Sequence, residues 1–374
     1  MIDPATTTPE PEHQPDRVKE HRSSPSPWVL VETSGGPGNR WVVAEGAQPR
    51  RHTRLERTHL AGSSTVAQHL PTAIEAAVTS AEPQVHTAYP PSGTRMRIMV
   101  VPVLGPADTV QAVQIWAGPR AQPVPPRPAV GTLLWTTPRN GVGLTSPALE
   151  RMLDSEMTTA TSRTLPDLMR HFEHIDDRAG LLRLFDESVP PGLWSAMAVT
   201  SGITTRARRA LFICARSTGV GRDRMVSAVV TDVSAGRSVP EPAMVTRLIR
   251  TLPVRSQHAI ALIDLNTGLV HEWVNPGPAP LDRWMSELPA VHPEDLPDLA
   301  GTRARLLGGA QHARSSWRVR FDPDAAWTAI HSNWTVLTRD SAPQAMLDLR
   351  VAVPAKRATP RDTTVAPPRE PGPR

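Results

Sequence analysis

Cysteine is almost absent from this chain of 374 residues. Cys214 is the only one, so neither an intramolecular disulfide nor a cysteine-based zinc site can form. It lies in the apolar run 211–215, where we expect a buried, unreactive thiol. Runs of about 18 apolar residues are also missing, and the N-terminus lacks a charged segment followed by an apolar one. The sequence therefore predicts no membrane span and no signal peptide, and it favours a cytoplasmic protein.

Lysine and aromatic residues are scarce as well. Lys19 and Lys356 are the only lysines, so the net charge of +5 comes from arginine, and aromatic residues make up 4% of the chain. Proteins that bind nucleic acids usually combine a concentrated basic face with stacking aromatics, so we do not expect a nucleic-acid partner. Three arginine-rich patches are either solvated surface or docking sites for an acidic partner or anionic ligand. They comprise Arg50, Arg51, Arg54 and Arg57; Arg206, Arg208 and Arg209; and Arg303, Arg305, Arg314, Arg318 and Arg320.

Sequence motifs of common enzymes are missing. No Gly-x-Ser-x-Gly elbow and no Walker sequence occurs. Gly141-Val-Gly143 lacks the third glycine of a dinucleotide loop, and Gly219-Val-Gly221 falls between two predicted strands, so both are interpreted as turns. The sequence therefore predicts no catalytic residues, and we expect the protein not to be an enzyme.

His171 and His174 form the one candidate metal site. The sequence around them predicts a helix, on which residues three apart share a face, and Asp176 and Asp177 lie close by in the sequence. Two imidazoles and a carboxylate could hold zinc or iron, and a metal-dependent enzyme is the weaker alternative that follows. A polar helix end, with His174 favoured by the helix dipole, explains the same residues without a metal, and we therefore predict none.

Proline, in contrast, is abundant, with 41 residues. Much of it lies at the two ends of the chain and in 119–130. Residues 1–27 and 354–374 have too few bulky apolar side chains to offset the entropy of ordering, and we expect disorder there. The proline-rich segment 119–130 is typical of an extended, semi-rigid spacer between domains.

The most informative stretch runs from residue 258 to residue 295. Two runs of β-forming residues flank Asn266-Thr267-Gly268, which predicts a β-hairpin whose turn follows Asp264. Gly268 can supply the positive φ that such a turn needs. His292-Pro293-Glu294-Asp295 then predicts a helix start, because Pro293 suits the first turn and the acidic residues suit the positive end of the helix dipole.

A similar hairpin, built from 28–33 and 40–44, opens the chain and indicates an internal repeat. A hairpin, then helices, then three strands resembles a PAS sensor domain. With the stretch from Val113-Gln-Ile-Trp through the prolines to Leu134-Trp135, the chain over about residues 28–353 resembles an actinobacterial family of tandem PAS-GAF-PAS sensor proteins. The resemblance implies that Asp264, Gly268, His292, Pro293 and Asp295 are structural signature residues of the last PAS domain.

The resulting fold prediction is an α+β protein of three PAS/GAF-like modules, each an antiparallel sheet with helices packed on it. The middle module is expected to be GAF-like, with PAS-like as the alternative, and helical spacing of apolar residues predicts a helix that joins it to the last module. The predicted domains are PAS-like 28–118, GAF-like 131–238, a connecting helix 239–254 and PAS-like 255–353.

The predicted function is signal transduction by binding a small molecule or a protein partner. Neither the cysteine motif of flavin-binding photosensory PAS domains nor the asparagine-lysine motif of cyclic-nucleotide GAF domains is present, and the cofactor stays unknown. The alternative is a ligand-free interaction scaffold whose cores are packed solid and whose sheet faces bind protein. A cavity of roughly 300 Å³ or more in a module would favour the ligand.

Overall fold

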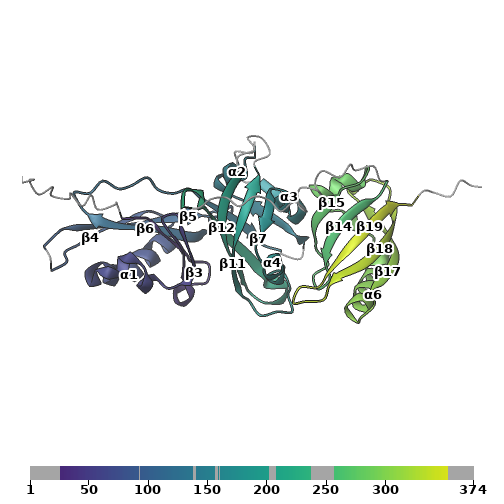
Figure 1. The fold of residues 1–374 in the computed structure, drawn as a ribbon, viewed down its shortest axis with the longest axis horizontal. Coiled ribbons are helices and arrows are strands. Elements are labelled where there is room, and N and C mark those ends of the chain that lie inside the picture. Colours follow the sequence, from purple (N-terminus) through teal and green to yellow (C-terminus); the bar gives the residue numbers. More distant parts are fainter. Residues whose placement is uncertain are drawn as a thin grey trace, which may run out of the picture.

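The computed structural model describes residues 26–91, 93–137, 140–155, 159, 161–201, 208–236 and 257–352. These residues form three antiparallel sheets in a row, and helices pack on each (Figure 1). The predicted α+β fold class, with three sheet modules, is confirmed. The tails predicted at 1–27 and 354–374 and the helix predicted at 239–254 lie outside the described residues, apart from residues 26 and 27.

The N-terminal sheet has the order β3-β2-β1-β6-β5-β4. One long helix, α1, covers it, and Ser63 caps the start of α1 by accepting a hydrogen bond from the Val66 backbone N–H. Val66, Leu70 and Ile74 recur at helical spacing and are buried against the sheet. The four-residue spacing of these apolar residues predicts a helix over 55–80. That prediction is confirmed for α1, but two 3-10 turns precede the helix. The elements are β1 (Val29–Glu32), β2 (Trp41–Glu45), β3 (Gln48–Thr53), η2 (Leu55–Arg57), η3 (His59–Gly62), α1 (Ser64–Ser80), β4 (Gln84–Ala88), β5 (Met96–Leu104) and β6 (Val110–Pro119).

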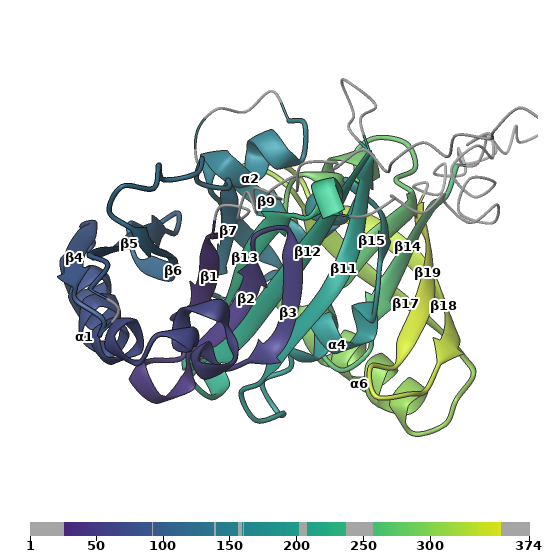
Figure 2. The ribbon, with the colours of Figure 1, turned by 60° about the vertical axis from the view of Figure 1, so that its left-hand side comes forward.

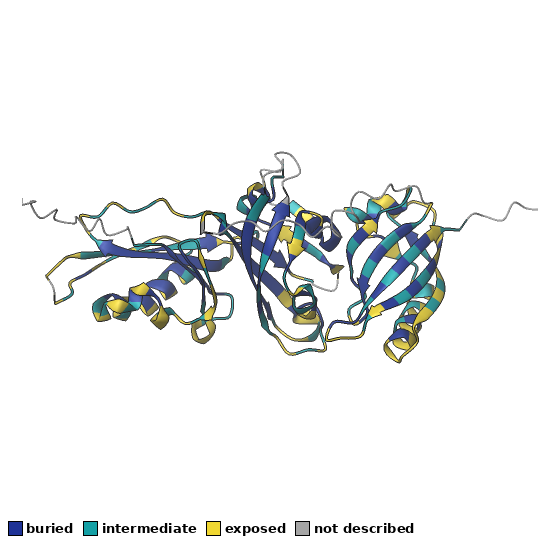
Figure 3. Cartoon of the chain, in the orientation of Figure 1, coloured by how far each residue is buried: buried dark blue, intermediate teal, exposed yellow. Residues whose placement is uncertain are grey.

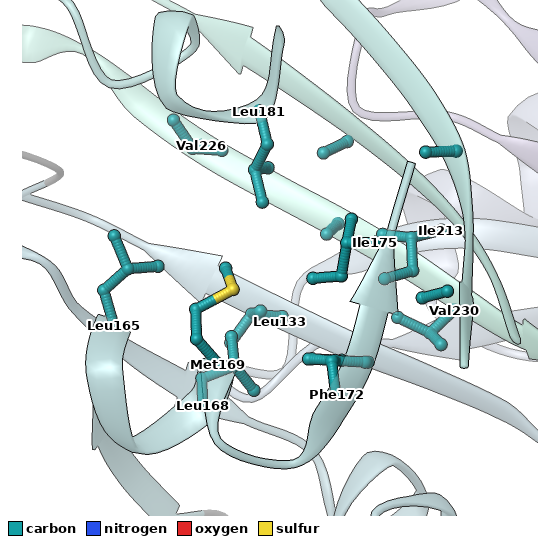
Figure 4. Packing of buried hydrophobic residues seen from close by; sticks show 14 of the residues in the cluster. Leu133, Leu165, Leu168, Met169, Phe172, Ile175, Leu181, Ile213, Val226 and Val230 are labelled. Carbon is teal, nitrogen blue, oxygen red and sulfur yellow. The ribbon is translucent and has the colours of Figure 1, made fainter. Parts of the chain in front are cut away.

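The middle sheet has seven strands in the order β10-β11-β12-β13-β7-β8-β9. Three short helices pack on one of its faces, around the core that Figure 4 shows. The elements are β7 (Val130–Trp135), β8 (Val142–Thr145), α2 (Pro147–Met152), β9 (Thr161–Thr164), α3 (Leu165–Met169), β10 (Phe172–Ile175), α4 (Arg178–Arg183), β11 (Leu193–Ser201), β12 (Arg208–Thr218) and β13 (Met225–Asp232).

The C-terminal sheet has the order β15-β14-β19-β18-β17-β16. Along β17 and β18 buried residues alternate with more exposed ones, so that one face is apolar, as the sequence predicts (Figure 3). The elements are β14 (Ala259–Asp264), β15 (Val270–Asn275), η7 (Leu281–Met285), β16 (Ala290–Val291), η8 (Pro293–Asp295), α6 (Leu296–Leu307), β17 (His312–Arg320), β18 (Thr328–Thr338) and β19 (Gln344–Val351).

All three sheets share one pairing, although the third strand of the C-terminal sheet, β16, pairs with β17 at the far edge and not with β15. The first strand of each pairs with the last, as β1 with β6, β7 with β13, and β14 with β19. The hairpins predicted at the start of the chain and after residue 258 are β1–β2 and β14–β15. The N-terminal and C-terminal sheets therefore have the order of hairpin, helix and three strands that the sequence indicates.

The N-terminal and middle sheets pack against each other face to face, with β1–β3 beside β11–β13 (Figure 2). Leu30 and Val43 of the first sheet share an apolar cluster with Phe212 and Cys214 of the second. Cys214 is buried there, and burial raises its pKa to about 12, as expected of an unreactive thiol. The proline-rich segment 119–130 is tied back to the first module, where the Trp28 indole N–H donates to the Pro125 carbonyl at 3.0 Å. Direct packing of the two sheets therefore sets their separation.

The spacing of apolar residues predicts one helix from Thr164 through Ile175 and another from Arg178 to Phe185. A strand interrupts this region, which corrects that prediction. The first helix ends at Met169, and Phe172–Ile175 forms the edge strand β10, paired with β11. Phe172 and Ile175 are both buried. On a helix, residues three apart lie on the same face, so a helix would give the same burial pattern. Here a shift in the pairing register between Phe172 and His174 turns both toward the core, so a strand produces the spacing of a helix.

Candidate functional site

A cavity of about 600 Å³ lies in the C-terminal module, between its sheet and α6. Small-molecule sites usually measure roughly 300–1,000 Å³. The alternation of β17 and β18 turns Trp317 and Trp334 toward the cavity, and η7 contributes Trp284. From α6, Leu296, Leu299, Ala300 and Arg303 reach it at helical spacing.

The aromatic wall of the cavity is held in place by hydrogen bonds. The Trp317 and Trp334 indole N–H groups both donate to Ser332 Oγ at 3.1 Å, and Ser332 lies 2.7 Å from Ser315 Oγ. The Trp284 and Trp317 rings meet edge to face, with centroids 5.5 Å apart. Buried indoles with satisfied N–H groups are restricted in rotation, so the cavity has a preformed flat surface.

Polar groups line the cavity near the β14–β15 turn. Buried Asp264 accepts hydrogen bonds from the Thr267 backbone N–H at 2.8 Å and from its hydroxyl at 2.7 Å. Burial raises the pKa of Asp264, and the bonds from Thr267 oppose that shift. Gly268 has φ +76°, as the sequence predicts for this turn, and its position lines the cavity together with Thr267.

Arg303 reaches this turn from α6. Its Nε donates to the Leu265 carbonyl at 3.0 Å, and Nη2 donates to the Asn266 carbonyl. A Cβ on Gly268 would lie 2.6 Å from Arg303 Nη1, so a larger residue at position 268 would force the guanidinium to shift. Burial lowers the pKa of Arg303, while the charges of Asp264 and Asp186 oppose that shift.

His292, Pro293 and Asp295 form the predicted helix start beside the cavity. The His292 ring accepts a hydrogen bond from the Glu294 backbone N–H at 3.3 Å, and Pro293 opens the 3-10 turn that leads into α6. Asp295 accepts from the backbone N–H and guanidinium of Arg318 at 2.7–3.0 Å, which lowers the pKa of Asp295. These residues fix the first turn of the helix that covers the cavity.

The cavity also adjoins the middle module. Asn140 of that module lines it, and α3 packs against β15. Leu269, one residue beyond Gly268, is buried in the middle core, and Arg178 forms an ion pair with Glu272. The Thr164 hydroxyl donates to the Met285 carbonyl, at the end of the helix that carries Trp284. A change in the cavity wall would therefore act on the junction between two modules.

The candidate metal residues His171 and His174 do not share a helix face, which corrects that premise. His171 lies buried in the turn before β10, whereas His174 is exposed on β10 and bonds Asp176 at 2.9 Å. Burial, with help from Arg163 and Arg170, lowers the pKa of His171 to about 4. Within the described ranges, no three His, Cys, Asp or Glu side chains are grouped so that they could hold a metal ion.

The sequence interpretation missed Arg303, Trp284, Trp317 and Trp334 as parts of one site. The sequence pattern groups Arg303 with four other arginines as a basic patch, but these side chains have different surroundings. Arg318 is paired with Glu294 and Asp295, and Arg320 lies over the Trp327 ring. The sequence does contain one signal for this site. Arg303 lies seven residues after Leu296, which places it on the apolar face of the helix α6.

Comparisons with known proteins show which proteins this architecture resembles. Residues 27–126 match the family model described as Rv3651-like, N-terminal. The crystal structure of an uncharacterised protein from Mycobacterium tuberculosis is similar over 87% of this chain and 96% of its own, with a TM-score of 0.67 and 21% identity. That likeness shows a shared fold extending well beyond the Rv3651-like region.

Two sensory proteins give much weaker matches. An RNA-binding Light-Oxygen-Voltage receptor has a TM-score of 0.22 at 11% identity, over 59% of this chain and 95% of its own. Methyl-accepting chemotaxis protein X has a TM-score of 0.18 at 11% identity, over 60% and 75%. No curated protein matches the chain significantly. No helix in the described ranges is long and apolar enough to cross a membrane.

Proposed function

We propose that this chain is a cytoplasmic sensory or regulatory protein of PAS, GAF and PAS modules that binds a small molecule in its C-terminal module. The cavity carries the proposal, because it measures about 600 Å³, twice the size at which the sequence interpretation favours a ligand over a solid core. Its role is binding rather than catalysis, and its partners are a small molecule or a signalling protein rather than a nucleic acid.

The proposed output of binding is a change at the junction with the middle module. Trp284 and Gly268 line the cavity. The residues that directly follow them in the chain, Met285 and Leu269, contact the middle module. A ligand that fits the cavity better in one arrangement of this junction shifts the population toward that arrangement. The interaction scaffold stays the alternative, in which the cavity is empty and the outer sheet face binds protein.

Native mass spectrometry of the purified full chain, compared with a denatured sample, tests this function. We expect a mass excess that disappears on denaturation. In Ala300→Trp, an indole fills the cavity beside α6, and the excess should be lost because Ala300 lines the cavity. Ala329→Trp is the matched control, since Ala329 is exposed on β18 and alternates with the inward-facing residues.

A bare-chain mass for the wild type, together with no rise in melting temperature across a small-molecule library, would contradict ligand binding. A mass excess that persists in Ala300→Trp would place the ligand elsewhere. The first result moves the function to the scaffold, whereas the second overturns the C-terminal cavity as the binding site.

A further inference from the structure

We propose that the cavity of the C-terminal module receives an apolar molecule that carries a single carboxylate, and that Arg303 binds the carboxylate. The inference rests on the proposed function and adds the chemical class of the ligand. It comes from the distribution of polarity in the cavity, which is apolar along α6 and the sheet and polar near the β14–β15 turn.

The charge of Arg303 is not matched by an ion pair. Its hydrogen bonds go to the carbonyl oxygens of Leu265 and Asn266, and no carboxylate of the described residues lies within 4.0 Å of it. Arg318 of β17, which lies near the N-terminal end of α6, has such partners, because it forms ion pairs with Glu294 and Asp295. A partly buried guanidinium held by neutral carbonyls retains capacity for an anion, because its five N–H donors exceed these two bonds.

The carboxylate whose charge acts most strongly on Arg303 is that of Asp264, and it is already engaged. Asp264 accepts two hydrogen bonds from Thr267, one from its backbone and one from its side chain. It stabilises the Arg303 charge from a distance without occupying the guanidinium. Arg303 lines the cavity, and the N–H donors that its two carbonyl bonds leave over are available to a ligand.

The remaining polar positions lie beside Arg303. Thr267 and Gly268 belong to the turn that it contacts, and Asn140 lines the same cavity from the middle module. Asp264 and Asp186, whose charges act on Arg303, do not line the cavity, so Arg303 faces neutral groups there. One guanidinium in such a lining matches the single charge and planar fork of a carboxylate, whereas a phosphate dianion would call for a second cation. The apolar body of the ligand would lie along Leu299, Trp317 and Trp334.

Binding of laurate and of 1-dodecanol to the full chain tests the inference. Both probes have the same twelve-carbon chain, and only laurate is charged. The chain is first stripped of bound lipid, and affinities are measured by calorimetry below the micelle concentration. We expect laurate to bind about tenfold or more tightly than dodecanol, because a hydrogen bond to a charged group raises affinity by about this factor. A carboxylate that is buried without a partner would instead make laurate bind more weakly than dodecanol.

Variants of α6 locate the effect. Arg303→Gln should weaken laurate about tenfold and leave dodecanol unchanged, and Arg303→Lys should keep part of the preference. Arg305→Gln, on the exposed side of the same helix, should change neither affinity. If Arg303→Gln fails to fold, the comparison of the two probes on the wild type still decides.

The failures of the two proposals are distinguishable. Equal affinities for both probes in the wild type, weakened together by Ala300→Trp, would overturn the carboxylate and leave the binding cavity standing. Absence of binding by either probe would overturn both the carboxylate ligand and an apolar ligand for this cavity. Laurate binding that is unaffected by Arg303→Gln would overturn the role of Arg303.

Discussion

Arg216 of the middle sheet donates two hydrogen bonds to Glu32 of the N-terminal sheet, 2.9 and 2.7 Å long, across 184 residues of sequence. The Glu32 side chain is almost fully buried, and Arg216 also donates to the Asn39 carbonyl at 2.7 Å. This pair lies within the apolar contact of two sheets, where an unpaired charge is costly. Any relative position of the two sheets that separates the pair would therefore leave a buried charge without its partner.

Arg216→Met should lower the free energy of unfolding by about 3 kcal/mol, because it leaves the buried Glu32 carboxylate without its partner. Urea unfolding followed by tryptophan fluorescence measures the change. The double variant Glu32→Leu with Arg216→Met should recover much of the loss, since it removes both charges. Arg283→Met, in an exposed ion-pair group, should leave stability within experimental error. Equal losses in the single and double variants would contradict this account.

His271 makes stability dependent on pH. Its ring is fully buried on β15 without a hydrogen-bond partner in the described ranges, and burial, aided by Arg178, lowers its pKa to about 3 from 6.5. Between these values the unfolded chain binds the proton more tightly than the folded chain does. The stability is therefore complete above pH 6.5 and falls as the pH drops toward 3. His171, with a pKa lowered to about 4, contributes with the same sign.

Urea unfolding at pH 7.5 and 5.5 should show a loss of about 1 kcal/mol from each of these two histidines. His271→Phe should remove one of these contributions and make the pH dependence shallower. An identical pH dependence in His271→Phe and the wild type would contradict a buried neutral imidazole.

Gly268→Ala should destabilise the β14–β15 turn by about 2 kcal/mol, since alanine is disfavoured at positive φ and its Cβ would meet the Arg303 guanidinium at 2.6 Å. Gly93→Ala separates the two causes. Gly93 has nearly the same φ, +77°, and nothing lies within 4 Å of its added Cβ, so only the backbone cost of about 1 kcal/mol applies. Chemical denaturation compares the variants, and a smaller loss for Gly268→Ala than for Gly93→Ala would refute the close approach of Arg303.

Leu269→Ala should uncouple the C-terminal module from the middle one. Leu269 lies between β14 and β15 in the sequence, but its side chain is buried in the core of the middle module. Truncating such a side chain to alanine lowers the free energy of unfolding by about 2–5 kcal/mol. Calorimetry should show a separate, lower transition for the C-terminal module. Leu337→Ala, on an exposed position of β18, should leave the unfolding profile unchanged. A single unshifted transition in Leu269→Ala would show that the junction does not depend on this contact.

Much of the fold was predictable from local patterns. The alternation of Trp317 and Val319 with Arg318 and Arg320 predicts β17 and its apolar face, and the four-residue spacing from Val66 to Ile74 predicts the covered side of α1. Gly268 and Pro293 mark a turn and a helix start through backbone geometry alone. The same patterns failed at Phe172 and Ile175, because a shift in register gives an edge strand the spacing of a helix.

Local patterns are enough to specify the sheet modules, since alternation, helical spacing and turn residues act over a few neighbouring positions. The packing in space, in contrast, brings Arg303 and three tryptophans around one cavity and pairs Glu32 with Arg216. Such contacts join residues far apart in the chain. They depend on which faces pack together and on which buried charge finds a partner, and no local pattern carries that information.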